Sequence, residues 1–167
     1  DARTGALRWY YQLAPNDGLD HDLAAAPILY RDSTGRRIVA AAGKDGYVHL
    51  VDRRTHKLIA KQAVTTVDDK VAVPTPEGVK VCPGVAGGVE WNGPAFDPQR
   101  KRLFVGSLDY CTVLTGRTGS APVAGGANYG GTWTGVGKPA GWIYALNADN
   151  GEVAWRFEAE HAVLGAI

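Results

Sequence analysis

Short runs of mainly apolar residues alternate with polar turn sequences along this chain. The turn sequences include Asp32-Ser33-Thr34-Gly35, Lys44-Asp45-Gly46 and Asp97-Pro98-Gln99-Arg100. No segment shows the sustained 3.6-residue periodicity of an amphipathic helix, so the pattern predicts short strands joined by tight turns. The expected strands are residues 26–30, 38–42, 47–51, 95–96, 102–106 and 142–146.

One sequence unit recurs, in which a turn containing glycine precedes a tryptophan. Residues 1–9 align with residues 147–155, and each copy ends on tryptophan. Residues 52–60 form a degenerate third copy, in which His56 replaces the glycine and Ala60 replaces the tryptophan. A tryptophan-bearing unit that repeats after tens of residues is typical of a propeller rather than a sandwich. The sequence therefore predicts an all-β propeller fold.

The aligned tryptophans have a structural interpretation. A strand that ends in a turn can be followed by a strand carrying a large aromatic side chain, which then packs against a neighbouring sheet. We therefore expect Trp9 and Trp155 to lie between adjacent sheets. The Thr4-Gly5 and Asn150-Gly151 turns should lie at the surface.

The composition is that of a globular domain. Hydrophobic residues make up 45% of the 167 residues and charged residues 21%, enough for one core. The net charge of +1 gives no reason to expect a nucleic-acid partner. No apolar run approaches the roughly 20 residues of a transmembrane helix. Residues 61–80 and 115–141 are expected to be long loops. Because the chain opens and closes within motifs, we interpret 1–167 as one partial propeller domain, truncated at both ends.

Three carboxylates in the segment Pro15-Asn16-Asp17-Gly18-Leu19-Asp20-His21-Asp22 offer candidate chemistry. Asp20 and Asp22 are two positions apart, so in an extended segment their side chains share one face. Together they could bind a hard cation, and one carboxylate beside a cation could act as a general base. The same residue types also form ordinary acidic turns. From these residues alone, both interpretations stay open.

The sequence contains two cysteines, Cys82 and Cys111. Their number alone fits two buried thiols as well as one disulfide. A disulfide would indicate an oxidising compartment.

Four motifs, in the same order along the chain, resemble the pyrroloquinoline quinone (PQQ) dependent dehydrogenases, the quinoprotein alcohol and sugar dehydrogenases. The first is Asn16-Asp17-Gly18-Leu19-Asp20-His21-Asp22, which is similar to the family's acidic signature although Leu19 replaces its usual tryptophan. The resemblance gives Asp20 the position of the catalytic base, which also approaches the metal ion. It gives Asp22 the position of a carboxylate in lanthanide-using members, and some members thought to use calcium share it.

The second and third motifs concern the cofactor. Lys44, within Gly43-Lys44-Asp45-Gly46, matches an Arg or Lys that reaches the quinone carbonyl oxygens, although the same residues suit a hairpin turn. Residues 82–91 resemble the family segment Cys-Pro-Gly-x-x-Gly-Gly-x-Asn-Trp, with Glu90 in place of the asparagine that contacts the cofactor. A carboxylate there would repel the quinone's carboxylates unless it were protonated or metal-bound. Trp91 fits the pattern.

The resemblance also implies a disulfide between Cys82 and Cys111. The fourth motif, residues 141–155, looks like the strand and docking unit that opens the family's late blades. The implied fold is part of an eight-bladed propeller with tryptophan-docking motifs, in which this chain would form about three blades.

The resemblance implies oxidation of an alcohol or sugar hydroxyl by hydride transfer to metal-bound PQQ, with Ca²⁺ or a lanthanide as the metal ion. Asp20 would take the hydroxyl proton, Lys44 would stabilise negative charge on the quinone, and Asp20 and Asp22 would approach the metal. The expected electron acceptor is cytochrome c or ubiquinone, and the expected location is the periplasm, in solution or at the inner membrane. The alternative is a non-catalytic scaffold propeller for protein interaction, which Glu90 and the degenerate middle repeat favour.

Overall fold

Nine antiparallel strands make up the regular structure of the residues described. The computed structural model describes residues 1–68, 73–116 and 130–167, and these residues contain strands but no helix. None of them therefore forms a helix capable of crossing a membrane. The strands are β1 (Ile28–Arg31), β2 (Arg37–Ala42), β3 (Tyr47–Asp52), β4 (Leu58–Ala63), β5 (Val79–Val81), β6 (Ala95–Asp97), β7 (Arg102–Gly116), β8 (Gly131–Asn147) and β9 (Val153–Ala159).

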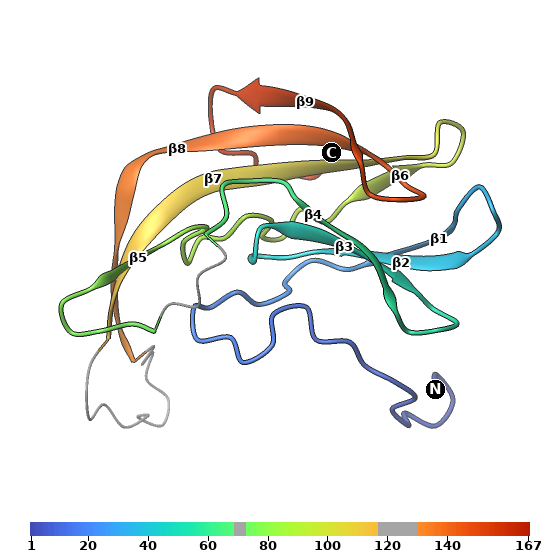
Figure 1. Cartoon of the computed structure of the whole chain (residues 1–167), viewed down its shortest axis with the longest axis horizontal. Coiled ribbons are helices and arrows are strands. Elements are labelled where there is room, and N and C mark those ends of the chain that lie inside the picture. The colour runs from blue at the N-terminus through green and yellow to red at the C-terminus, as the bar shows by residue number, and fades with distance from the viewer. Residues whose placement is uncertain (69–72, 117–129) are drawn as a thin grey trace.

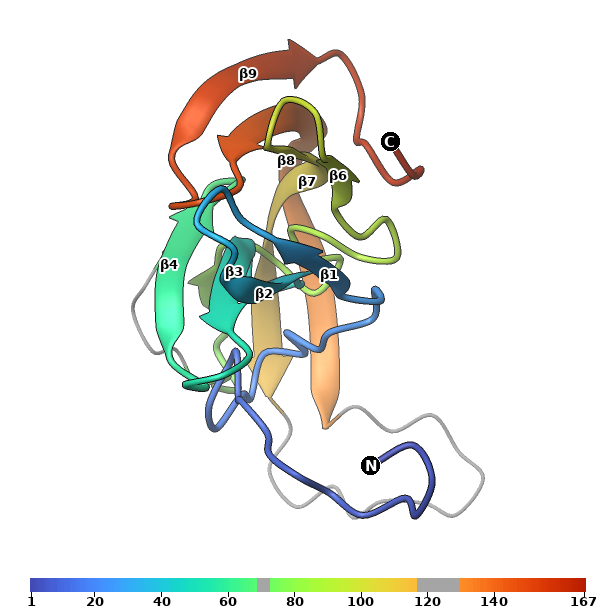
Figure 2. The same cartoon turned by 90° about the vertical axis from the view of Figure 1, so that its right-hand side faces the viewer.

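The strands form two sheets that lie one above the other (Figures 1 and 2). The first sheet is a four-stranded meander in the order β1-β2-β3-β4. The second has the order β5-β7-β8-β9, and β6 pairs with the other end of β7. The long strands β7 and β8 arch over the first sheet, and the N-terminal segment runs beneath it (Figure 1). The expected all-β fold is confirmed, and the expected strands correspond to observed ones.

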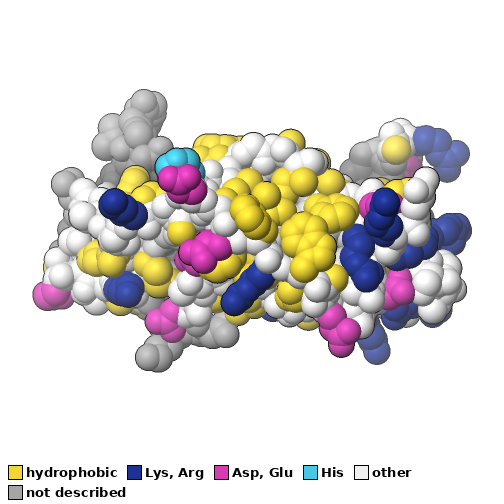
Figure 3. All heavy atoms as spheres, turned by 90° about the horizontal axis from the view of Figure 1, so that it is seen from above, with side chains coloured by type: hydrophobic (Ala, Val, Ile, Leu, Met, Phe, Trp, Pro, Cys, Tyr) yellow, Lys and Arg dark blue, Asp and Glu magenta, His cyan; other side chains and the backbone are white. Residues whose placement is uncertain are grey.

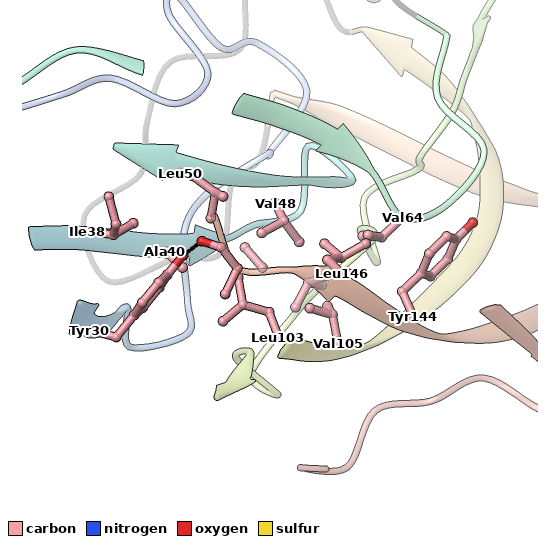
Figure 4. Close-up of a cluster of buried hydrophobic side chains, with 13 residues drawn as sticks. Tyr30, Ile38, Ala40, Val48, Leu50, Val64, Leu103, Val105, Tyr144 and Leu146 are labelled. Atoms are coloured by element: carbon pink, nitrogen blue, oxygen red, sulfur yellow. Dashed lines mark hydrogen bonds between the residues drawn. The ribbon is translucent and has the colours of Figure 1, made fainter. Parts of the chain in front are cut away.

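The hydrophobic core lies between the two sheets and follows the two-residue alternation of strands. In β2 the buried side chains include Ile38 and Ala40, and in β7 they include Leu103 and Val105. Figure 4 shows these side chains pointing toward one another from opposite sheets. Burial of this shared apolar face holds the sheets together.

Tyr30 connects the sheets by a polar contact within this core. Its ring stacks on Phe96 of β6 with centroids 4.4 Å apart, and its hydroxyl donates a hydrogen bond of 2.6 Å to the carbonyl oxygen of Ala148 (Figure 4). Burial of the hydroxyl is the main cause that raises the pKa of Tyr30, and the negative charges of Asp149 and Asp32 raise it further. The phenol therefore keeps the proton that it donates.

The expectation of a long loop at 115–141 is wrong at both ends, because β7 extends to Gly116 and β8 begins at Gly131. The glycine content that suggests a loop serves close packing instead. A β-carbon on Gly135 would overlap the hydroxyl end of Tyr110, so glycine lets this ring lie across the strand pair. Likewise, the loop expected at 61–80 begins after β4 ends at Ala63 and is interrupted by β5. Residues 69–72 and 117–129, which belong to these two expectations, lie outside the described residues.

The three repeat copies contact one another in sequence order. Trp9 stacks on His56, with ring centroids 4.5 Å apart and planes 16° from parallel. A β-carbon on Gly151 would lie 2.9 Å from the Cβ atom of Ala60. In each case the residue at the tryptophan position of one copy lies on the residue at the glycine position of the next. The repeat is therefore an interface motif that fixes neighbouring units together.

Neither tryptophan lies between two sheets as expected, since Trp9 is in the coil before β1. Trp155 is exposed and lies tilted against Phe104, rather than between two sheets of the described residues. The described residues form two sheets, and no third sheet follows β9 to cover this side chain. Hydrophobic side chains accordingly gather on the face seen in Figure 3, and β9 exposes Val153, Trp155 and Phe157. The Thr4-Gly5 turn is exposed as expected, whereas Gly151 is buried by its contact with Ala60.

The expected count of about three blades is also corrected. The described residues form two sheets, because no strand precedes β1. Pro15 and Pro27 interrupt this N-terminal segment, and Asn16 and Asp20 adopt left-handed backbone conformations that strands do not contain.

We predict that Tyr30→Phe lowers the free energy of unfolding by about 1–2 kcal/mol, because it leaves the buried carbonyl of Ala148 without its donor. Urea unfolding of the purified protein measures this loss. Tyr10→Phe is the matched control, since Tyr10 is exposed, and it should change stability by less than about 0.5 kcal/mol. Equal effects of the two substitutions would contradict the role of the Tyr30 hydroxyl.

Candidate functional site

The acidic segment is a turn that Asp17 holds in shape. One carboxylate oxygen of Asp17 accepts a hydrogen bond from the backbone N–H of Leu19 at 3.0 Å, and the other accepts from that of His21 at 2.8 Å. The imidazole Nε2 of His21 lies 3.1 Å from the carbonyl oxygen of Pro83. Asp20, at the centre of the turn, has a φ of 65°, which is unusual for a residue other than glycine. The turn therefore holds Asp20 in a strained conformation of the kind found at functional sites.

Lys44 draws three carboxylates together. It lies in the turn between β2 and β3, and its side chain is only 7% exposed. The ammonium nitrogen Nζ lies 2.8 Å from Oδ2 of Asp20, 2.9 Å from Oδ1 of Asp22 and 3.8 Å from Oε1 of Glu90. The structure thus brings all four of these predicted site residues to one place. Both aspartates reach the same ammonium although they lie in a coil rather than a strand.

The glycines of the third motif let two loops approach closely beneath Lys44. A β-carbon on Gly87 would lie 2.5 Å from Cγ of Lys44, and one on Gly88 would lie 2.5 Å from Cα of Gly46. Two backbone hydrogen bonds join the loops: the N–H of Gly88 donates to the carbonyl of Lys44, and the N–H of Val89 donates to that of Gly43. This contact places Glu90 beside Lys44.

The same loop is tied to β7 by a disulfide. Cys82 and Cys111 are bonded, with Cα atoms 4.5 Å apart, which confirms the expected pairing. The N–H of Gly84 also donates a 2.8 Å hydrogen bond to the carbonyl of Tyr110. The loop from Cys82 to Glu90 is therefore anchored to β7 at its start and to the Lys44 turn at its end.

The cluster has more negative than positive charge, and the pKa values of its members reflect this. Burial raises the pKa of Glu90; the Lys44 ammonium opposes this increase, while Asp22 and Asp20 add to it. For Lys44, burial favours loss of the proton, but hydrogen bonds to Asp20 and Asp22 outweigh burial and raise its pKa. Lys44 is therefore a fixed cation, and Glu90, with a side chain only 12% exposed, keeps its proton to a higher pH than an ordinary glutamate.

A pocket of about 660 Å³ opens over this cluster. Both charged and apolar side chains line it. The lining comprises Asp17, Gly18, Leu19, Asp20, Lys44, Pro74, Val85, Ala86, Glu90, Leu114, Thr115, Gly116, Gly130, Gly131, Thr132 and Trp133. A pocket of this size accommodates a small organic ligand, with Lys44 as a hydrogen-bond donor for its carbonyl oxygens.

The donor set also suits a hard metal ion in part. Asp20 and Asp22 supply carboxylate oxygens, which calcium and lanthanide ions prefer. Among residues 1–68, 73–116 and 130–167, however, no cluster of three or more His, Cys, Asp or Glu residues is placed to hold a metal ion. These two carboxylates thus fit a site that needs further ligands.

Two residues stand apart from the sequence expectations. Trp91 is 70% exposed and does not line the pocket, so its contact with a cofactor stays a prediction. Trp133 does line the pocket, but the sequence placed it in an expected loop. The available signal was the alternation Thr132-Trp133-Thr134, which suits a strand.

Comparison with known proteins gives this geometry its context. The family model described as glucose/ethanol/alcohol dehydrogenase, β-propeller domain, matches residues 1–69. The quinohemoprotein alcohol dehydrogenase ADH IIB of Pseudomonas putida is 24% identical over 98% of this chain and 33% of its own length. The lanthanide-dependent methanol dehydrogenase of Methylacidiphilum fumariolicum is 31% identical over 73% of this chain and 24% of its own length. This chain thus spans no more than a third of the length of these two relatives.

Solved structures share the fold. The quinohemoprotein alcohol dehydrogenase of Comamonas testosteroni superposes with a TM-score of 0.80 over 99% of this chain and 30% of that chain, at 20% identity. A europium-containing methanol dehydrogenase superposes with a TM-score of 0.70 over 93% of this chain and 31% of that chain, at 22% identity. The two sheets therefore form part of a β-propeller, and the chain belongs to the family of PQQ-dependent quinoprotein dehydrogenases.

Proposed function

We propose that this protein is a PQQ-dependent dehydrogenase that oxidises an alcohol or sugar hydroxyl, with Asp20 as the general base. The observation that carries the proposal is the convergence of Asp20, Asp22 and Glu90 on the buried Lys44 ammonium within one pocket. A scaffold propeller has no need of a buried cation that gathers carboxylates at a pocket, because this arrangement costs desolvation energy.

The geometry of Asp20 suits proton transfer. Lys44 binds Oδ2, and among the described residues Oδ1 has no hydrogen-bond partner, while the side chain is 60% exposed. Oδ1 can therefore accept the proton of a substrate hydroxyl, and the Lys44 ammonium keeps the carboxylate oriented. When bound, PQQ with its metal ion would supply the electrophile that accepts the substrate's hydride.

Lys44 and Asp22 have separate roles in this proposal. Lys44 offers an ammonium that stays charged at neutral pH and can stabilise negative charge on the carbonyl oxygens of a bound quinone. Asp22 offers a second hard oxygen beside Asp20 for Ca²⁺ or a lanthanide ion.

Glu90 fits a quinone that carries carboxylates only when Glu90 is neutral. A protonated carboxyl resembles an amide in size and in its ability to donate a hydrogen bond. Its burial next to two further carboxylates supports this state, since a single ammonium serves all three groups. Glu90 would then donate to the cofactor as the family's asparagine does.

We further propose a small alcohol or sugar as substrate, cytochrome c or ubiquinone as electron acceptor, and a periplasmic location. The names of the relatives support an alcohol, because they include alcohol and methanol dehydrogenases. The Cys82–Cys111 disulfide supports the periplasm, since disulfides persist in oxidising compartments.

We predict that Asp20→Asn lowers kcat for dye-linked alcohol oxidation by about a hundredfold to ten-thousandfold, because the amide cannot accept the proton. The measurement uses the PQQ-loaded protein and an artificial electron acceptor. Glu158→Gln, an exposed site on β9 away from the pocket, is the control and should keep wild-type turnover. Wild-type turnover of Asp20→Asn would refute Asp20 as the base, and absence of turnover in the wild-type protein with every alcohol and sugar tested would favour the scaffold.

Asp22→Ala should change metal preference rather than remove the base. Loss of one carboxylate should weaken binding of a trivalent ion by about tenfold or more, and weaken Ca²⁺ binding less, because the attraction scales with ion charge. Terbium luminescence, with Ca²⁺ as competitor, measures both affinities without catalysis. Unchanged terbium affinity would show that Asp22 is not a ligand.

Glu90→Gln should stabilise the protein at neutral pH. In the unfolded chain Glu90 releases its proton as the pH rises above 4.5, whereas the raised pKa in the folded protein delays this release to a higher pH. The wild type therefore loses stability as the pH rises from 4.5 to the folded pKa. Glutamine has no such loss. The stability gap, measured by urea unfolding from pH 4 to 8, should therefore widen as pH rises, and a gap independent of pH would contradict a raised pKa. The exposed Glu158→Gln serves as the reference for a carboxylate outside the cluster.

A further inference from the structure

The pocket has a second functional end, formed by the hairpin of β7 and β8. Leu114 of β7 and Trp133 of β8 are direct partners in the antiparallel register, so their side chains lie next to each other on one face of the sheet. Both line the pocket that contains Asp20, Lys44 and Glu90. Leu114 is buried, whereas Trp133 is 55% exposed. Trp133 therefore lies beside Leu114 and presents indole surface to a ligand.

We propose that Trp133, supported by Leu114, is a specificity-determining wall that selects alcohols with an apolar tail over sugars. This inference rests on the proposed function, because it assigns the substrate class of the same pocket. A hydroxyl held at Asp20 leaves the rest of the substrate to extend along the pocket. An unbranched alkyl or aromatic tail would then lie against the indole.

Outside its charged residues, the lining of the pocket has little to offer a polyol. Its side chains are apolar at Trp133, Leu114, Val85, Ala86 and Pro74. Thr115 and Thr132 are the polar, uncharged side chains that line it, within the described residues. A sugar would place several hydroxyls here and lose more hydrogen bonds to water than two threonine hydroxyls can replace. Each buried methylene of an apolar tail, in contrast, strengthens binding by about threefold to fourfold.

The wall is held at a fixed position relative to the charged end. Cys111 lies three residues before Leu114 on β7, and its disulfide to Cys82 ties the strand to the loop that ends at Glu90. At the end of β7, the N–H of Gly116 donates a 2.9 Å hydrogen bond to the carbonyl of Thr75. A covalent bond and a backbone hydrogen bond thus connect the wall to its surroundings, as a size-selective surface requires.

The test compares kcat/KM for ethanol, 1-hexanol and glucose in the PQQ-loaded wild type, Trp133→Ala and Trp133→Phe. The wild type should prefer 1-hexanol to ethanol and oxidise glucose poorly. Trp133→Ala should lose about tenfold or more for 1-hexanol and less than about twofold for ethanol, because ethanol does not reach the wall. Trp133→Phe should retain most of the preference. Val136→Ala on the same strand, outside the pocket, is the control and should behave as the wild type.

A tertiary alcohol, 2-methyl-2-heptanol, separates this inference from the proposed function. Its carbinol carbon carries no hydrogen, so it can bind without being oxidised. Calorimetry should show binding to the wild type that weakens about tenfold or more in Trp133→Ala. If the wild type turns over no alcohol but binds this compound through Trp133, the proposed function fails and the wall stands. If turnover is found but Trp133→Ala affects ethanol and 1-hexanol equally, or leaves binding unchanged, the wall is refuted and the proposed function stands.

Discussion

A single buried ammonium among three carboxylates is the interaction on which this site depends. Lys44 can neutralise only one negative charge, yet Asp20, Asp22 and Glu90 all approach it. The excess negative charge can be compensated in two ways: by a proton on the most buried carboxyl, or by a cation beside the two exposed ones. Both ways match the chemistry proposed here, in which Glu90 holds a proton while Asp20 and Asp22 face a metal ion.

The backbone around Lys44 makes this charge arrangement possible. The disulfide and the glycine pair at Gly87 and Gly88 bring one loop of the second sheet against a turn of the first. Larger residues at either glycine would meet Lys44 or Gly46 and separate the loops. The carboxylate of Glu90 and the ammonium of Lys44 therefore meet across the junction of two sheets, and the stability of that junction determines the electrostatics of the site.

The sequence was informative where local chemistry decides the structure. Alternating apolar residues located the core strands, such as the one around Ile38 and Ala40, because burial of one sheet face imposes a two-residue period. The site residues Asp20, Asp22, Lys44 and Glu90 could be named from motifs that keep a family's order. The sequence failed where contacts between distant segments decide. The extended β7–β8 hairpin was missed because the reason for a glycine such as Gly135 is the Tyr110 ring on the other strand, and Trp133 was missed with it.

The contact between Ala60 and Gly151 joins the two sheets that also contribute to the pocket. With only a methyl group at the tryptophan position, the two sheets approach each other there as closely as a glycine backbone permits. The pocket spans the same two sheets, with Lys44 on the first and Trp133 on the second. Side-chain volume at position 60 thus acts as a spacer between the two sheets at this contact. A larger side chain there would meet the backbone of Gly151 and push the sheets apart.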